Sequence, residues 1–383
     1  MYMDISSFLN SKIQLPVIHL SEISRIMLDK IVHQIHLGQK ARVIKGAITS
    51  KRLGPTEFPK GVDFYYIVDE IREEIENMSK IGKRYEFKIG GRLFVIYAIL
   101  PMTGSVDAYK ILDMSVKKMY LWLYVATYFS PTECSRELTV YLYLTEHKKK
   151  LPYKREPIDK EHANTAFTTA CPIAPNNIYI FRKEEWFKVF IHETFHSLGL
   201  DFAKMPEKPA NDAMFSIFPV RCDLRFYETY TEMWAEIINV IFVCLEKGGL
   251  TTKKIEDALQ EERIFSLFQC VKVLNHHNIK YRELTTLKGG SRYKESTNAF
   301  SYYILKSICM FFYPDFIEWC VRKNKGTIAF LKTQPNILSL VDFINRKHNN
   351  PGFITAIETL EQWFSTTKYK GPLMDTMRMT IHG

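Results

Sequence analysis

Near the middle of the chain, the segment His192-Glu193-Thr194-Phe195-His196 combines two metal-ligand side chains with a carboxylate. On a helix, residues four apart lie one turn above each other, so both imidazoles can chelate one ion. The other side of this helix is apolar and can be seated in a core. Glu193 is turned about 100° from His192, which suits a base that acts on an attacking water without binding the metal. The segment therefore predicts a hydrolytic zinc site.

A catalytic zinc ion needs a third protein ligand, which leaves one position open for water or substrate. One known solution places His or Asp three residues after a glycine that follows the second histidine. Here that glycine is Gly199, and the required position is Phe202, while Asp201 comes one residue early. We therefore expect the third ligand to be a glutamate on a later helix.

The segment 225–245 places three acids, Glu228, Glu232 and Glu236, along one side of a helix whose other sides are aromatic and aliphatic. Buried like charges repel each other unless a cation or hydrogen-bond donors neutralise them. A solvated acidic stripe is the competing interpretation. We predict Glu232 as the third ligand, with Glu236 accepting a hydrogen bond from a ligand histidine. The alternative has Glu228 as the ligand and Glu232 in the supporting role.

The motif at 192–196 followed by Glu232-x-x-Ala235-Glu236 resembles the gluzincin superfamily of zinc metallopeptidases. Segments 164–169 and 178–185 are similar to metallopeptidase-like proteins of large nucleocytoplasmic DNA viruses. The likeness covers about residues 164–310. It implies a zincin-like core with one zinc ion that hydrolyses peptide bonds in a peptide or protein substrate.

Catalysis would also need donors for the developing oxyanion and a surface that holds the substrate. Tyr302 and Tyr303 are the candidate donors, ahead of His276 and His277. By resemblance, the strand 164–169 lies along the cleft, so Ala166, Phe167 and Thr168 would bind an extended peptide as an added strand. Arg292 is the candidate for binding a substrate carboxylate, with a solvated loop as the alternative.

The elements expected to position these residues indicate an α+β fold. Helices are predicted at 17–37, ended by Gly38, and at 64–81, 108–128, 183–198, 225–245 and 298–312, with a hairpin at 85–97 and strands at 138–144, 164–169 and 177–181. We expect an N-terminal α+β lobe over 1–105, an upper lobe with the sheet and the zinc helix over 106–200, and a helical lobe over 201–383. The first boundary lies near 103–107.

Composition limits the other functions. The net charge of +10 favours acidic partners, but the basic stretch 148–155 has no accompanying nucleic-acid motif, so specific nucleic-acid binding is disfavoured. No apolar run reaches the roughly 18 residues of a membrane span, so we expect a soluble intracellular protein, in the host cytoplasm or virion if the chain is viral. Seven scattered cysteines predict reduced thiols. The competing functions are a catalytically inactive zincin-fold structural or virion protein and a basic nucleic-acid-binding protein.

Overall fold

The computed structural model describes residues 5–59, 67–102 and 107–382. The chain divides into two compact units. The sheet unit comprises residues 28–148 and 164–201, and the helical unit comprises residues up to 27, 149–163 and 202–382. The helix α2 (Glu22–Arg42) contributes residues to both units. No helix within the described ranges is long and apolar enough to cross a membrane.

The sheet unit contains a mixed six-stranded sheet in the order β1-β2-β3-β4-β6-β5. The strands are β1 (Thr49–Arg52), β2 (Lys80–Ile89), β3 (Arg92–Pro101), β4 (Glu137–Tyr143), β5 (Ala166–Thr168) and β6 (Asn176–Ile180). Strands β3, β4 and β6 run parallel, and β5 pairs antiparallel with β6 at one edge. The predicted hairpin is confirmed as β2 and β3. It turns at Gly90 and Gly91, which both have the positive φ that a tight turn requires.

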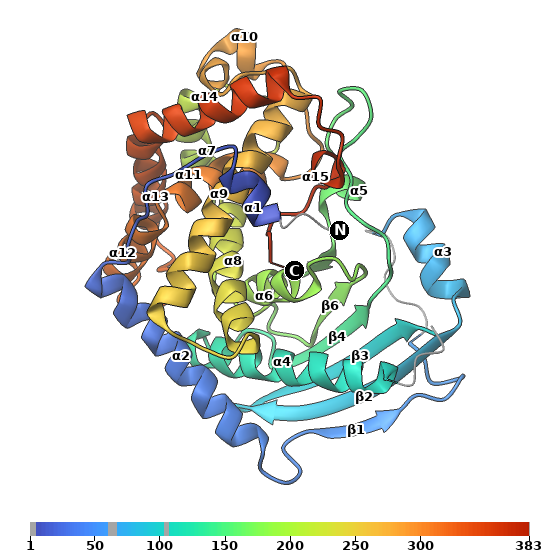
Figure 1. Cartoon of the computed structure of the whole chain (residues 1–383). Helices are drawn as coiled ribbons and strands as arrows, with labels where there is room; N and C mark the ends of the chain where they lie inside the picture. Colours follow the sequence, from blue (N-terminus) through green and yellow to red (C-terminus); the bar gives the residue numbers. More distant parts are fainter. Residues whose placement is uncertain (1–4, 60–66, 103–106, 383) are drawn as a thin grey trace. The chain divides into compact units, whose positions relative to one another are not determined.

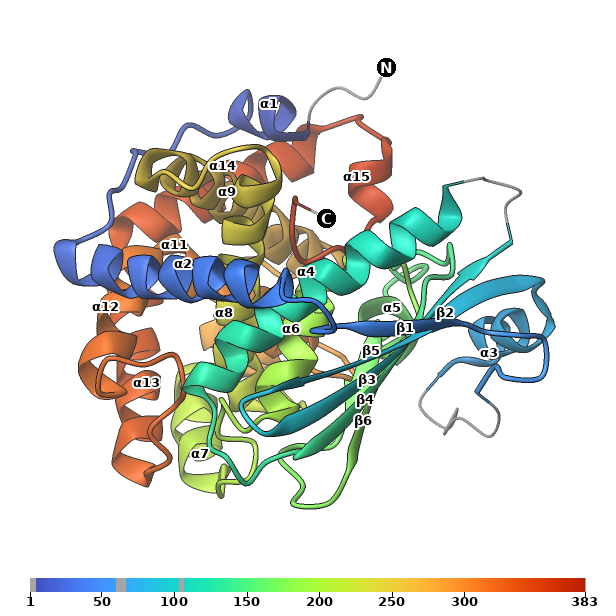
Figure 2. The same cartoon turned by 90° about the horizontal axis from the view of Figure 1, so that it is seen from below.

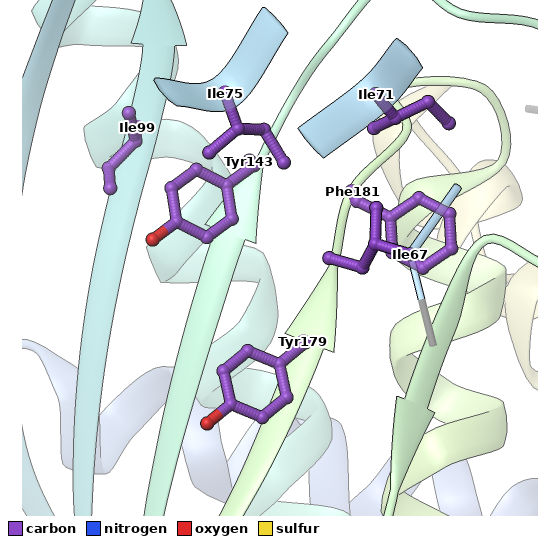
Figure 3. Packing of buried hydrophobic residues seen from close by; sticks show 7 residues of the cluster. All are labelled: Ile67, Ile71, Ile75, Ile99, Tyr143, Tyr179 and Phe181. Atoms are coloured by element: carbon purple, nitrogen blue, oxygen red, sulfur yellow. The ribbon is translucent and has the colours of Figure 1, made fainter. Parts of the chain in front are cut away.

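Side chains alternate between the two faces of this sheet, as they must along a strand. One face is covered by α4 (Ala108–Phe129) and α6 (Trp186–Ser197), both of which pack on its strands (Figure 2). On the other face, Ile71 and Ile75 of α3 (Asp69–Asn77) join a cluster with Tyr143 and Tyr179 (Figure 3). Helix α6 therefore lies on the buried face of the sheet, whereas the face under α3 is only partly buried.

Two predicted helix boundaries in this part of the chain are wrong. Gly38 lies inside α2, because a Cβ there would be only 3.1 Å from the ring of Tyr124, so the glycine permits close packing instead of ending the helix. The helix predicted at 64–81 is confirmed only over Asp69–Asn77, since Lys80 already begins β2. Residues 64–66 and most of the expected boundary at 103–107 lie outside the described residues.

The helical unit is built around two long helices that lie side by side, α8 (Phe226–Glu246) and α9 (Thr252–His276) (Figure 1). Its other α-helices are α1 (Ile5–Asn10), α5 (Lys160–Ala163), α7 (Lys208–Ile217), α10 (Leu287–Gly290), α11 (Lys306–Phe311), α12 (Tyr313–Lys323), α13 (Gln334–Lys347), α14 (Pro351–Thr366) and α15 (Pro372–Asp375). The 3₁₀ turn η2 (Tyr281–Thr285) precedes α10. The helix predicted at 298–312 begins as a π-helical segment, η3 (Phe300–Leu305), and continues as α11.

The segment 373–382 is held in the helical unit by side chains that bind its backbone. Lys272 donates to the carbonyl of Leu373 at 2.9 Å, and Asn239 donates to that of His382 at 2.7 Å. Glu262, which is fully buried, accepts from the amide of Ile381 at 3.0 Å. Since buried polar groups are costly without partners, the backbone of this segment supplies hydrogen-bond partners that the polar side chains of the unit's core need.

The α+β class is confirmed. The unit boundary between Asp201 and Phe202 lies next to the expected division at 200/201.

Candidate metal centre

Helix α6 presents its two histidines to one point. The Nε2 atoms of His192 and His196 are 3.0 Å apart, and their rings are nearly perpendicular. Two nitrogens that each lie about 2.0–2.1 Å from a tetrahedral zinc ion are roughly 3.3 Å apart. A separation of 3.0 Å also permits a hydrogen bond between two neutral rings. The pair therefore has the spacing of two ligands to one ion, and metal analysis distinguishes the two states.

The second histidine is oriented by Asp201, a residue that the sequence analysis considered only as a ligand. The Asp201 carboxylate is buried and accepts a hydrogen bond from Nδ1 of His196. With Nδ1 protonated, the lone pair of the neutral ring lies on Nε2, the atom that faces His192. A carboxylate on the outer nitrogen of a ligand histidine fixes the tautomer and the ring orientation.

The turn after α6 brings Asp201 to this position. Gly199 has φ +66°, and the amide of Leu200 donates to the carbonyl of Phe195 at 2.8 Å. This arrangement is a Schellman cap, in which a left-handed glycine ends the helix and folds the chain back along it. The predicted end of the helix at Gly199 is therefore confirmed, and the same turn places a carboxylate five residues after His196.

The carboxyl end of α6 is held by polar contacts from the sheet side of the unit. Ser135 donates to the carbonyl of Ser197 at 2.7 Å, and the side-chain amide of Asn176 donates to the Ser197 hydroxyl at 2.9 Å. The amide of Cys171 donates to the carbonyl of His196 at 2.9 Å. The bonds to the carbonyls of Ser197 and His196 satisfy acceptors at the end of the helix, where the last four carbonyls lack partners within the helix.

A disulfide lies beside these contacts and corrects the expectation that all cysteines are reduced. Cys134 and Cys171 are bonded, 37 residues apart in the sequence. Sequence spacing could not show this pairing because the two cysteines meet only through the fold. The other five thiols are free, and four of them are buried.

The back of α6 is anchored to α4. The indole N–H of Trp122 donates to the hydroxyl of Thr194, and its ring stacks on Phe195 with centroids 5.9 Å apart. Trp122, Thr194 and Phe195 are fully buried. Thus the two residues between Glu193 and His196 fix the rotation of the helix, while His192, Glu193 and His196 are each 6–7% exposed.

In the helical unit, the acids of α8 are buried, which excludes the solvated-stripe interpretation. Glu228, Glu232 and Glu236 are 6%, 1% and 0% exposed. Glu236 forms a buried ion pair with Lys306 of α11, a cation that the sequence analysis missed. Burial raises the pKa of Glu236 well above its usual range, and Lys306 opposes this shift. Glu236 therefore has a structural partner within its own unit.

The candidate oxyanion donors have partners as well. The hydroxyl of Tyr303 donates to the carbonyl of Met377 at 2.6 Å, and Tyr302 is 9% exposed. His276 contacts the carbonyl of Glu156 through Nε2 at 2.8 Å. Burial lowers the pKa of His277 to about 3, so its ring is neutral at pH 7.

Contacts within their own units involve Phe167 and Arg292, two of the predicted substrate-binding residues. Ala166, Phe167 and Thr168 form β5, the edge strand of the sheet, and the Phe167 ring stacks on Tyr179 at 4.8 Å. Arg292 forms an ion pair with Glu283 at 2.6 Å. Gly289 and Gly290 permit close packing, because a Cβ at either would be within 2.3 Å of a backbone oxygen.

A second set of potential ligands comprises Asp159, just before α5, with Glu161 and His162 on that helix. Suitable atoms of Asp159, Glu161 and His162 lie within 4.8 Å of one another, but Glu161 is exposed. The three residues are local in sequence, and exposed acidic groups of this kind are ordinary surface features. The buried, oriented histidine pair of α6 is the stronger candidate. No family model, curated protein or solved structure matches this chain, so the chemistry of these residues is the basis for assigning a function.

Proposed function

We propose that this protein is a zinc-dependent peptidase of the gluzincin type. The observation that carries the proposal is the pair of Nε2 atoms 3.0 Å apart on α6, one of them on a ring oriented by Asp201. A buried imidazole pair with a carboxylate behind it is the donor set that zinc prefers. Zinc, when bound, would polarise the scissile carbonyl and lower the pKa of the attacking water towards about 7.

The third ligand in this proposal is a carboxylate of α8. The sequence favoured Glu232 because Glu236, one turn on, could accept a hydrogen bond from a ligand histidine. The Glu236 carboxylate pairs with Lys306, and Asp201 holds the outer nitrogen of His196. This removes the reason for preferring Glu232 over Glu228, the alternative ligand.

Glu193 is the general base of the proposed reaction. It follows His192 directly on α6 and is 7% exposed, so it lies in the same buried environment as the histidines. It takes a proton from the attacking water and delivers it to the leaving amine. Strand β5 supports the substrate role because an edge strand leaves backbone groups on one side for an extended peptide.

Metal analysis tests this proposal first. The full chain, purified without added metal, is expected to hold about one zinc ion per molecule and to cleave fluorescein-labelled casein. A chelator should abolish cleavage, and zinc should restore it. Folded protein that binds no zinc at micromolar concentration would exclude the proposal, whereas stoichiometric zinc without cleavage of any peptide library would favour the inactive zincin-fold protein.

Single substitutions then identify the ligands. His192→Ala and His196→Ala should each lose zinc, and His36→Ala, a histidine on α2 outside the zinc helix, is the control. Between Glu228→Ala and Glu232→Ala, the variant that loses zinc marks the ligand, with the exposed Glu246 of α8 as the control position. Retention of zinc by both variants would show that α8 does not supply the third ligand.

A further inference from the structure

A buried arginine in the helical unit has no counter-ion among the residues that the structure describes. Arg263 of α9 is 2% exposed. Its guanidinium donates to the carbonyls of Phe311 at 2.9 Å and Pro16 at 2.8 Å, and to the side chain of Gln260 at 3.2 Å. Among the residues that the structure describes, no carboxylate lies within ion-pair distance of it, and its Nη2 atom has no acceptor.

This charge is costly where it stands. Buried cations are normally paired, because neutral oxygens replace only part of the hydration that is lost. The ring of Phe311 lies 4.1 Å from the guanidinium carbon and adds a cation–π contact. Burial nevertheless lowers the pKa of Arg263 to about 10. An anion next to Nη2 would compensate the charge.

Arg263 lines a cavity of about 450 Å³, a size within the range of small-molecule sites. The wall is mainly apolar and includes Ile18, Phe311, Phe312 and Pro314. Two titratable residues also line it, and each already has a partner. Asp315 is paired with Lys347, and His19 contacts Glu256 at 3.1 Å.

We propose that this cavity binds a small carboxylic acid with an aromatic or alkyl body. The carboxylate would accept from the unused Nη2 atom of Arg263, since a guanidinium is suited to planar carboxylates. The apolar body would lie against Phe311, Phe312 and Ile18. This site is independent of the proposed zinc chemistry, because none of the residues that line it is a proposed zinc ligand, base or substrate-binding residue.

Two positions separate ligand binding from a purely structural role for Arg263. Arg263→Lys keeps a positive charge and a donor but loses the planar fork. Gly352 lines the cavity, and a Cβ there would meet only Asn350 Oδ1 within 4 Å, at 3.3 Å, so Gly352→Leu can extend into open space. That change fills the cavity without touching the hydrogen bonds of Arg263. Arg322→Lys, at a position paired with Glu318 on the surface, is the matched control.

The test uses saturation-transfer NMR and calorimetric titration on the full chain, with phenylacetate and hexanoate as probes. At least one of these acids should bind, and its neutral amide should bind at least tenfold more weakly. Arg263→Lys and Gly352→Leu should each reduce the affinity at least tenfold, with unchanged circular dichroism, while Arg322→Lys binds like the wild type. Absence of binding by both acids, or equal affinity for acid and amide, would overturn the proposal. Equal affinity for inorganic phosphate would overturn the role of the apolar wall.

Discussion

The carboxylate of Asp201 accepts a hydrogen bond from Nδ1 of His196, the second histidine of the candidate metal-ligand pair on α6. This bond makes Nε2 the unprotonated nitrogen of the neutral ring. Asp201 is also the residue that lies one position before the third-ligand position of a different class of zinc site. Asp201 thus orients a candidate ligand histidine through its outer nitrogen.

Asp201→Asn should weaken zinc binding by about 10–100-fold, because an amide holds the imidazole less firmly and without charge. The measurement is a competition titration against a chromophoric chelator. Asp212→Asn is the matched control, since Asp212 is 61% exposed at its side chain. Unchanged zinc affinity in Asp201→Asn would show that this hydrogen bond does not support a ligand.

Glu193→Gln should keep its zinc and lose peptidase activity by at least about 100-fold, because the amide cannot accept the proton from water. Zinc content and initial rates of casein cleavage, measured on the same preparation, check this prediction. Glu137→Gln, at an exposed position of β4, is the control. Equal rates in wild type and Glu193→Gln would assign the base to another residue.

Lys306→Met should destabilise the protein by about 3–5 kcal/mol, because it leaves the carboxylate of Glu236 buried without its cation. The exposed Lys323 of α12 provides the control, Lys323→Met. The double variant with Glu236→Met should recover much of the loss. If the double variant is no more stable than Lys306→Met, Lys306 acts through contacts other than the ion pair, including its bond to the carbonyl of Met379.

Lys306→Met should become less stable as the pH rises. Burial raises the pKa of Glu236 above its ordinary value of 4.5. Above that value the folded state retains a proton that the unfolded state releases, so stability falls with increasing pH. The measurement is urea denaturation of Lys306→Met and of the wild type at pH 5 and pH 8. The variant's loss of unfolding free energy relative to the wild type should be larger at pH 8 than at pH 5. The opposite order would contradict the assignment.

Cys134→Ser should lower the free energy of unfolding by about 4 kcal/mol, the loop-entropy estimate for a bond between cysteines 37 residues apart. A reductant should lower the melting temperature of the wild type but not that of Cys134→Ser. Cys222→Ser, which changes a free thiol, is the control. A wild type that is insensitive to reductant would show that the disulfide is not formed in solution.

Helix α6 and its surroundings were largely predictable because their signals are local. The apolar face of α6, Gly199 at its end and the two glycines of the hairpin each act within a few residues. Gly38 was misassigned because the ring that packs against it, that of Tyr124, is distant in sequence. Long-range pairings such as Cys134 with Cys171 and Glu236 with Lys306 leave no spacing pattern, so only the fold reveals them.

Asp201 was missed for a different reason. Motif reasoning treats an acid near a zinc helix as a ligand or discards it, whereas its actual role depends on the direction in which the chain leaves Gly199. The positive φ of Gly199 and the return bond from Leu200 to Phe195 determine that direction. A helix end of this kind followed closely by Asp is a signal that could have identified the residue.

The segment 373–382 has a practical consequence for anyone who shortens this chain. Lys272, Tyr303 and Lys306 all donate to its carbonyls from within the helical unit. Deleting this segment would leave these buried donors without their acceptors. It would also remove part of the core of the helical unit. Truncated variants for expression should therefore retain residues 373–382, since this segment is an integral part of the helical unit.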